Sequence, residues 1–374
     1  MNTRRIRTPR VAAAVAIAAL MTTVVAVAAP GASDAAGSGH KGDRQAGAKA
    51  AQQSPKQATV KAAAVQAKVS WKPMWHSEFG TSADQWPDAW KSAPQASLSD
   101  WSVLDRTMVS WEKKSQARYL KRNVDQSGGN LVITTRRVCA TKAPSGHLDF
   151  SWLKNSQPSV DRCAGKRNHP VYTSGRLQMQ NPAFQPTGAN VRIDFKATLP
   201  TQPATGTRQA LWANNATSYC NSTDKVVTNL GEVDALEWYG NAPSGSFSTT
   251  HMSCRGTGDD PWQTIRREHR DPVQAGTTHI WSVRKTGNSV SYYLDGQRVE
   301  EKSSKRPDTC GTAPFDVPAP ADCNVIMNSP WMTILQGEVF KGKFDASKRQ
   351  SGPNDAADFA QQQLKVDWVR VYTR

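Results

Sequence analysis

The chain has 374 residues, a formal net charge of +16 and 38% hydrophobic residues. The charge divides evenly, because residues 1–70 hold 10 Lys and Arg against 2 Asp and Glu, and residues 71–374 hold the remaining 37 against 29. A charge of +8 in each part, without a long basic run or a nucleic-acid motif, argues against a nucleic-acid partner. Attraction to an acidic polysaccharide or a cell wall stays open.

The first 29 residues have the layout of a secretory signal peptide. Four arginines among the first ten residues precede an apolar stretch, Val11 to Ala29, that ends in small residues. This arrangement predicts export and cleavage near Ala29, so the mature protein is expected to be secreted and extracellular, without stable membrane association. A retained membrane anchor is the alternative, because the apolar stretch is long enough to span a bilayer.

Residues 30–70 are predicted to be a flexible, low-complexity linker. They consist mostly of Ala, Gln, Lys, Gly and Ser and contain no Trp, Tyr or Phe, so they cannot bury enough apolar surface to offset the entropy of ordering. All 13 Trp residues lie in 71–374. Residues 71–374 are therefore expected to form the folded domain, and no internal repeat divides them.

Short strand-like segments separated by Gly, Pro and Asn dominate the domain. Residues 281–299 predict a β-hairpin, with one turn at Thr286-Gly287-Asn288 and a second tight turn at Asp295-Gly296. Many such strands predict an all-β fold, an antiparallel β-sandwich, rather than βαβ units. The expected strands are 129–138, 173–180, 190–200, 231–240, 278–287, 289–299 and 364–374.

Six cysteines behind a signal peptide predict up to three disulfide bonds. Six cysteines allow fifteen pairings. Pairing between sequence neighbours is expected, because each bond would then close one loop-rich insertion. Neither Cys-x-x-Cys nor His-x₃-His spacing occurs, which argues against a zinc site. The expected pairs are 139–163, 220–254 and 310–323.

The segment GEVDALEWYG, residues 231–240, places three carboxylates in an otherwise apolar run: Glu232, Asp234 and Glu237. A helix would scatter them around its axis. On a regular strand, Glu232 and Asp234 share a face and Glu237 points to the other. One extra residue, a β-bulge at Ala235 and Leu236, returns Glu237 to the common face, and bulges are frequent beside active sites.

Three carboxylates on one face suggest acid–base chemistry. With the bulge, Glu232 and Glu237 lie roughly 13 Å apart along the backbone. Side chains that lean together bring the two carboxyl groups to about 5 Å, the separation found in retaining glycosidases. Mutual repulsion raises at least one pKa in such a cluster, which suits that group as an acid, and Asp234 would tune the other two. From the residues alone, an acidic strand face on the surface is the alternative.

The Glu-x-Asp-x-x-Glu pattern resembles the bulged, laminarinase-like signature of glycoside hydrolase family 16. Further segments resemble that family in the same order along the chain, so the resemblance covers most of residues 75–374. These segments are 122–137, 172–180, 191–200, 210–212, 250–252, 278–299 and 366–372.

The resemblance implies a jelly-roll, concanavalin A-like sandwich with a concave substrate cleft. By position in the motif, Glu232 matches the nucleophile of the family. Asp234 matches the assisting acid, and Glu237 matches the acid/base. The implied enzyme is a glycoside hydrolase that cleaves O-glycosyl bonds by double displacement and requires no cofactor.

The same resemblance suggests further site residues. Trp212 and Trp238 match aromatic positions near the cleft, where ring faces suit sugars. His251 matches a histidine that can contact the substrate or the catalytic cluster. A place in the core is the alternative for the two tryptophans, and a structural role is the alternative for the histidine. Glu78 and Asp367 are candidate ligands of a structural calcium ion, since oxygen donors from separated segments suit calcium.

Substrate identity stays open at the sequence level, because segments 219–231 and 330–344 depart from the family pattern. The first hypothesis is a monomeric, secreted endo-hydrolase of β-1,3-glucan or mixed-linkage β-glucan. The second is the same machinery acting on a galactan of the agar, carrageenan or arabinogalactan type, or on a charged wall polymer. A non-catalytic carbohydrate-binding domain is the third, although three intact acids argue against it. A secreted structural or inhibitor domain is the fourth.

Overall fold

The computed structural model describes eleven stretches of the chain. They all belong to the second of two units, Met1–Ala64 and Val65–Arg374, so the predicted signal peptide and nearly all of the linker lie outside them. No helix in these stretches is both long and apolar enough to cross a membrane. The described residues are 70–80, 82–105, 117–140, 169–216, 218–220, 225–227, 231–252, 267–299, 308–309, 320–340 and 360–374.

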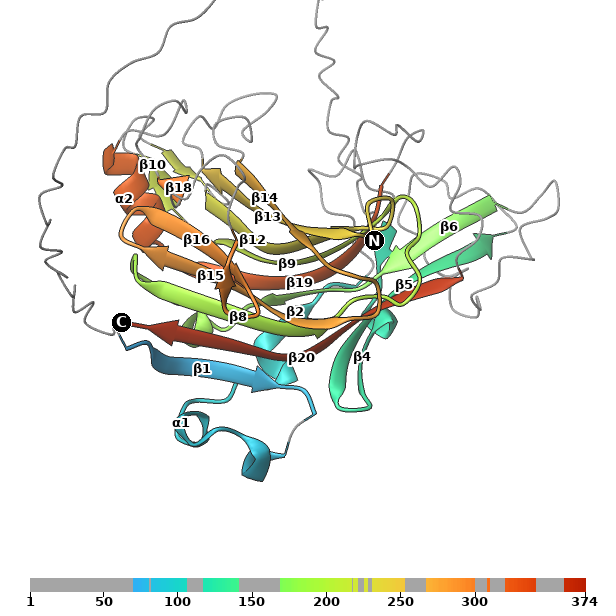
Figure 1. The fold of residues 1–374 in the computed structure, drawn as a ribbon, viewed down its shortest axis with the longest axis horizontal. Helices are drawn as coiled ribbons and strands as arrows, with labels where there is room; N and C mark the ends of the chain where they lie inside the picture. The colour runs from blue at the N-terminus through green and yellow to red at the C-terminus, as the bar shows by residue number, and fades with distance from the viewer. Residues whose placement is uncertain are drawn as a thin grey trace, which may run out of the picture. The chain divides into compact units, whose positions relative to one another are not determined.

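Two large β-sheets lie one above the other in Figure 1. The first sheet contains, in spatial order, β17 (Gln297–Arg298), β16 (Ser289–Leu294), β15 (Thr278–Thr286), β8 (Val191–Thr198), β20 (Gln361–Thr373), β5 (Asn130–Ala140), β6 (His169–Ser174) and β3 (Ala117–Tyr119). Three more strands pair with its members: β1 (Lys72–Glu78) with β20, β4 (Val124–Ser127) with β5, and β18 (Asp308–Thr309) with β16.

The second sheet carries the acidic segment. It contains, in spatial order, β14 (Arg267–Pro272), β13 (Gly245–Met252), β12 (Gly231–Tyr239), β9 (Thr207–Asn215), β19 (Trp331–Val339), β7 (Arg176–Met179) and β2 (Trp101–Val103). A separate pair is formed by β10 (Ser218–Cys220) and β11 (Lys225–Val227). Segment 330–344, which resembled no family strand, therefore supplies β19, a strand inside this sheet.

Helices are short among the described residues. The α-helices are α1 (Asp88–Lys91) and α2 (Pro320–Asn328), and the 3₁₀ turns are Ala83–Gln85, Leu98–Asp100, Lys121–Asn123 and Pro182–Phe184. Every strand segment predicted from the sequence contains a strand, and nearly all pairings are antiparallel, with β3–β6 parallel. The predicted all-β sandwich is confirmed.

The hydrophobic core lies between the two sheets. Successive side chains of a strand point to opposite faces, so alternate residues of each sheet meet in this layer. The first sheet contributes Phe195 and Trp281, and the second contributes Leu211 and Val233, all of which are buried in one cluster. Burial of each such side chain is worth roughly 1.5–3 kcal/mol. The second sheet therefore has one apolar face on the core and one face free for other chemistry.

The predicted hairpin is also confirmed. Thr286 pairs with Ser289 at the end of β15 and β16, which leaves Gly287 and Asn288 as the turn. Gly287 has a φ of 57°, a left-handed conformation that glycine adopts without steric cost.

Candidate active site

A β-bulge in β12 brings the three carboxylates to one face. β12 pairs with β9 on one side and with β13 on the other, and its register shifts after Asp234 on both sides. Three steps along β12, from Asp234 to Glu237, match two steps on β9, from Trp212 to Ala210. The extra residue places Glu237 on the face that Glu232 and Asp234 share, as the sequence predicted.

The intervening side chains of β12 point into the core. Val233, Ala235, Leu236 and Trp238 all belong to the buried cluster between the sheets. Trp238 is 0% exposed, and its indole Nε1 donates a hydrogen bond to the carbonyl oxygen of Pro243 at 3.2 Å. The prediction that Trp238 binds substrate is therefore wrong, because the residue after Glu237 points to the opposite face of the strand.

Trp212 lies on the same face as the carboxylates. It pairs with Asp234 across the sheet and packs against Ala210 and Ile334. The guanidinium carbon of Arg176 lies 5.2 Å from the centroid of its ring, within cation–π range. The position of Trp212 fits the sequence expectation, and its contact with substrate stays a prediction.

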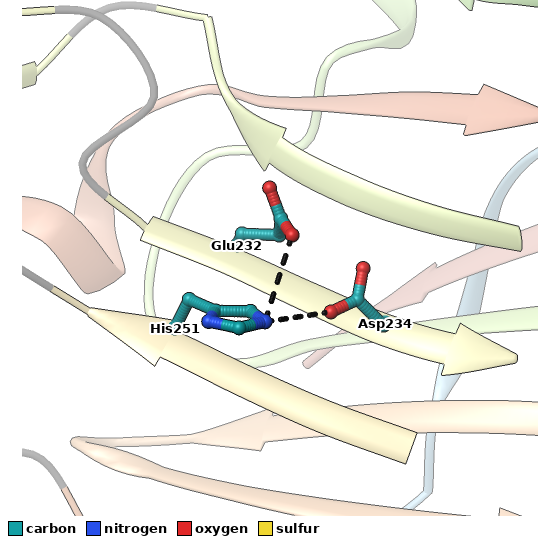
Figure 2. Close-up of side chains that lie close together, drawn as sticks. All are labelled: Glu232, Asp234 and His251. Carbon is teal, nitrogen blue, oxygen red and sulfur yellow. Dashed lines mark ion pairs between the residues drawn. The ribbon is translucent and has the colours of Figure 1, made fainter. Parts of the chain in front are cut away.

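His251 joins the cluster from the neighbouring strand β13, as Figure 2 shows. Its Nε2 lies 3.4 Å from Asp234 Oδ2 and 3.8 Å from Glu232 Oε1. The ligand atoms of Glu232, Asp234 and His251 lie within 4.8 Å of one another, and this is the one such group that could hold a metal ion among the described residues. Both carboxylates belong to the predicted sugar-cleaving motif, and the catalytic role of the group stays a prediction.

Glu237 is held by three donors. Its Oε1 accepts hydrogen bonds from Arg208 Nη1 and from the Tyr239 hydroxyl, each at 2.7 Å. Its Oε2 accepts a hydrogen bond from Thr249 Oγ1 at 2.9 Å. The other end of the Arg208 guanidinium donates to Glu338 on β19. Arg208 thus connects Glu237 on β12 to Glu338, which lies two strands away on β19.

Arg208, Tyr239, Thr249 and Glu338, the four partners in this network, were not predicted from the sequence. The position of Tyr239 could have been predicted from strand alternation, since it lies two residues after Glu237 and shares its face. Arg208 likewise alternates with Trp212 along β9. Thr249 and Glu338 carried no local signal, because their positions depend on the register of β13 and β19 against their neighbours.

The surroundings give the two glutamates opposite protonation preferences. Burial raises the pKa of Glu232, and the negative charge of Asp234 raises it further, to about 8. Burial also tends to raise the pKa of Glu237, but the charge of Arg208 and the hydrogen bond from Tyr239 outweigh it and lower the pKa to about 2. The surroundings therefore favour the protonated form of Glu232 and the ionised form of Glu237.

We expect Glu232→Gln to stabilise the protein more at pH 9 than at pH 5. The pKa of Glu232 lies above its ordinary value of 4.5, so the folded state binds more protons and loses stability as pH rises from about 4.5 to about 8. Glutamine removes that loss because it stays neutral. Calorimetry at both pH values measures the difference in melting temperature. For the exposed control Asp88→Asn, the change in melting temperature should be the same at pH 5 and pH 9. The same change at both pH values for Glu232→Gln would contradict the raised pKa of Glu232.

The two candidate calcium ligands each pair with a cation of the chain. Glu78 Oε1 accepts a hydrogen bond from Arg370 Nε at 2.8 Å and lies 3.2 Å from His76 Nδ1. Asp367 Oδ2 lies 2.6 Å from Lys196 Nζ. A calcium ion would have to compete with both basic side chains, and the calcium site stays a prediction.

The disulfide predictions involve cysteines beyond the described residues. Cys163, Cys254 and Cys310 lie outside the described stretches, and each belongs to a different predicted pair. Cys323, the expected partner of Cys310, lies in α2 and is completely buried in the core cluster. The three pairings stay predictions.

Solved structures share this fold, although no protein-family model and no curated protein matches the chain. The catalytic domain of an endo-1,3-β-glucanase (laminarinase) from Thermotoga petrophila superimposes with a TM-score of 0.51, covering 81% of this chain and 98% of that chain. The endo-β-1,3-glucanase of Pyrococcus furiosus gives 0.51, with 81% and 94% covered. Each is 18% identical in sequence to this chain. The chain has the fold of these glucanases.

A third structure widens the range of activities found on this fold. It comes from a study of endo-acting O-glycanases that initiate mucin breakdown, expressed by members of the human gut microbiota, and matches with a TM-score of 0.53 at 18% identity. The match covers 81% of this chain and 91% of that chain. At this identity the likeness describes the fold, so the activity has to be argued from the site.

Proposed function

We propose that the protein is a secreted endo-glycosidase that hydrolyses a β-linked polysaccharide with retention of configuration. The observation that carries the proposal is the bulge of β12, which gathers Glu232, Asp234 and Glu237 on one face of a central strand. Retaining glycosidases need two carboxyl groups beside the scissile bond. The substrate proposed first is β-1,3-glucan or mixed-linkage β-glucan, supported by the fold shared with endo-1,3-β-glucanases.

The electrostatics of the cluster support this chemistry. Double displacement requires one ionised carboxylate to attack the anomeric carbon and one protonated carboxyl to give its proton to the leaving oxygen. Environments that push two carboxyl pKa values apart supply such a pair at one pH. Glu232 and Glu237, with pKa values of about 8 and about 2, meet this requirement. No cofactor takes part in the proposed reaction.

A second candidate substrate is an acidic polysaccharide. Arg176 on β7 lies on the same face and is 5% exposed, and its Nε and Nη1 have no hydrogen-bond partner in the part of the chain that the structure describes. Gln336, its cross-strand neighbour, is completely buried, and neither of its amide atoms has a hydrogen-bond partner among the described residues. Buried polar atoms of this kind call for a partner. A uronate or sulfate group on the substrate would supply one.

Product analysis of the full chain tests the proposal. Laminarin, lichenan, agarose, carrageenan and arabinogalactan are each incubated with the protein, and new reducing ends and product lengths are measured. Cleavage of laminarin or lichenan into oligosaccharides is expected, and carrageenan is the acidic alternative. Proton NMR of the first product should show the β-anomer. Binding to any of these polymers without new reducing ends would favour a carbohydrate-binding domain and overturn the proposal.

Two tryptophan variants separate the cleft from the core. Trp238→Ala should lower the free energy of unfolding by about 3–5 kcal/mol, because it deletes a fully buried ring, and leave KM unchanged. Trp212→Ala should raise KM, because it removes a ring beside the carboxylates. Denaturant unfolding and steady-state kinetics on both variants check the pair. A raised KM for Trp238→Ala would contradict its place in the core.

A further inference from the structure

Two arginines flank a threonine at one end of the first sheet, where β3, β6 and β5 are neighbours. Thr173 on β6 pairs with Arg118 on β3 and with Arg136 on β5. Residues that pair across neighbouring strands point to the same face, and the strands lie about 4.7–4.9 Å apart. Arg118, Thr173 and Arg136 therefore form a basic row across one face of the sheet.

The basic row lies on the outer face of the first sheet. Ala117 and Tyr172 form a buried cluster with Val339 of the second sheet, so their side chains point toward that sheet. Arg118 and Thr173 each follow one of these residues in the chain, and adjacent residues of a strand point to opposite faces. The acids of β12 lie on the outer face of the second sheet. The basic row and the candidate active site are therefore on opposite sides of the sandwich.

Each residue of the basic row has a buried polar atom that makes no hydrogen bond with the described part of the chain. These atoms are Arg118 Nη1, Arg136 Nε and Thr173 Oγ1. Thr173 is 1% exposed, whereas the two arginines are half-buried and can be reached from solvent. Buried polar groups in native proteins nearly always have a partner, which can be a bound ion. The basic row is therefore suited to a ligand that accepts several hydrogen bonds.

The charge of the basic row points to an anion. Among the described residues, neither Arg118 nor Arg136 pairs with a carboxylate. Burial lowers the pKa of both groups, and the positive charge of Arg122, in the 3₁₀ turn after β3, lowers the pKa of Arg136 further. Arginine nevertheless stays protonated in proteins. The row thus holds two partly buried positive charges with a third beside them.

Other arginines of the same sheet are neutralised by carboxylates of the chain. Arg192 Nε donates a hydrogen bond to Asp194 Oδ1 at 2.8 Å, and Arg370 Nε donates one to Glu78 Oε1 at 2.8 Å. Charges taken out of water are normally paired in this way. The basic row departs from this pattern, which favours a counter-charge supplied by a bound ligand.

We propose that Arg118, Thr173 and Arg136 form a binding site for a tetrahedral oxyanion, namely a sulfate or phosphate group. A guanidinium presents paired N–H donors that match the oxygens of such a group, and the hydroxyl of Thr173 lies between the two guanidinium groups as a further donor. Arg122 adds positive charge beside the site. The inference does not depend on the proposed hydrolase activity, because the acidic face takes no part in it.

Equilibrium dialysis of the full chain against radiolabelled sulfate tests the site. In chloride buffer of constant ionic strength, we expect saturable binding of a single sulfate per chain. Arg118→Gln and Arg136→Gln should each weaken binding about tenfold or more, because each removes a charged hydrogen-bond donor. The control Arg298→Gln removes the same charge at the opposite edge of the sheet and should bind sulfate as the unaltered protein does. The absence of saturable binding, or an equal loss in the control, would overturn the proposal.

Melting temperatures keep the test valid if a variant folds poorly. Millimolar sulfate should raise the melting temperature of the unaltered protein above its value in chloride, since a ligand of the folded state stabilises it. Arg298→Gln should show the same rise, and Thr173→Val, which has nearly the shape of threonine without its hydroxyl, should show a smaller one. Equal rises in the unaltered protein, Thr173→Val and Arg118→Gln would indicate a general salt effect and contradict the site.

Competition distinguishes two sources of the oxyanion. Unlabelled sulfate and inorganic phosphate should both displace the labelled sulfate, and failure of both to do so would contradict a specific site. Displacement by carrageenan, a sulfated galactan, but not by agarose would identify a sulfate ester of a polysaccharide as the ligand. Displacement by the inorganic anions alone would identify a free anion. Either of these last two results upholds the site.

This inference and the proposed function can fail separately. Because the basic row lies across the sandwich from the acids, Arg118→Gln should keep the kcat and KM of the unaltered protein on laminarin. A protein that binds sulfate at the basic row but cleaves no polysaccharide would leave the site standing and refute the hydrolase. A protein that cleaves laminarin but binds no sulfate would do the reverse.

Discussion

Glu237→Gln should lower kcat on laminarin by about 10²–10⁴-fold, the usual contribution of a general acid, with little change in KM, because Glu237 matches the acid/base of the resemblance. Glutamine has nearly the shape of glutamic acid but has no proton to give to the leaving oxygen. The loss should be much smaller for 2,4-dinitrophenyl β-laminaribioside, because dinitrophenolate leaves without protonation. Steady-state kinetics on the two substrates measure the difference.

Glu232→Gln is the matched control for this prediction, because Glu232 matches the nucleophile of the resemblance. A missing nucleophile blocks the first step whatever the leaving group is, so this variant should lose activity on both substrates to a similar extent. The two variants differ by five positions on one strand, and both exchange a carboxyl for an amide. If Glu237→Gln lost equal activity on both substrates while Glu232→Gln kept its activity on the activated substrate, the roles would be the reverse of those that the resemblance implies.

The bulge of β12 could be predicted from the sequence because the spacing of the three acids requires it. Glu237 lies an odd number of residues from both Glu232 and Asp234, so an unbulged strand would bury it in the core. Core placement of an unpaired carboxylate is unfavourable. An extra residue at Ala235 and Leu236 resolves the conflict and gives two apolar side chains to the core. Local chemistry was enough to predict this feature.

The error at Trp238 came from treating nearness in sequence as nearness in the site. Trp238 follows Glu237 directly, and adjacent residues of a strand point to opposite faces. Applied to Trp238, the rule that placed the acids would have placed this side chain in the core. The resemblance assigned the residue to the cleft instead, and the structure shows the alternation to be decisive.

The long-range ion pairs could not be predicted from the sequence. Arg208 and Glu338 are 130 residues apart, and Arg370 and Glu78 are 292 apart. Their contacts depend on the strand order of each sheet and on its register, which no local pattern specifies. These two ion pairs nevertheless decide the state of two carboxylates that the sequence singled out. Arg208 favours the ionised form of Glu237, and Arg370 pairs with Glu78, a carboxylate that was predicted as a calcium ligand.

Arg208→Gln should destabilise the protein by about 3–5 kcal/mol, because it leaves Glu237 and Glu338 as buried carboxylates without their shared cation. Denaturant unfolding at pH 7 measures the loss. Lys91→Gln is the control, since it breaks an exposed pair with Asp88 at 2.9 Å and should cost less than about 1 kcal/mol. Equal losses for the two variants would contradict the buried network.

The same variant should move the limb of the pH profile that Glu237 sets. The pKa of Glu237 lies below its ordinary value of 4.5, so the stability it contributes is present above about pH 4.5 and disappears as pH falls toward 2. Without Arg208, Tyr239 and Thr249 still donate to Glu237, but the largest influence lowering its pKa is gone. The limb of kcat/KM that Glu237 sets should therefore shift to higher pH in Arg208→Gln. Arg208→Lys, which keeps the charge and loses the paired donors, should shift it less. A purely structural role for Arg208 would lower the stability of both variants and leave the limb where it is.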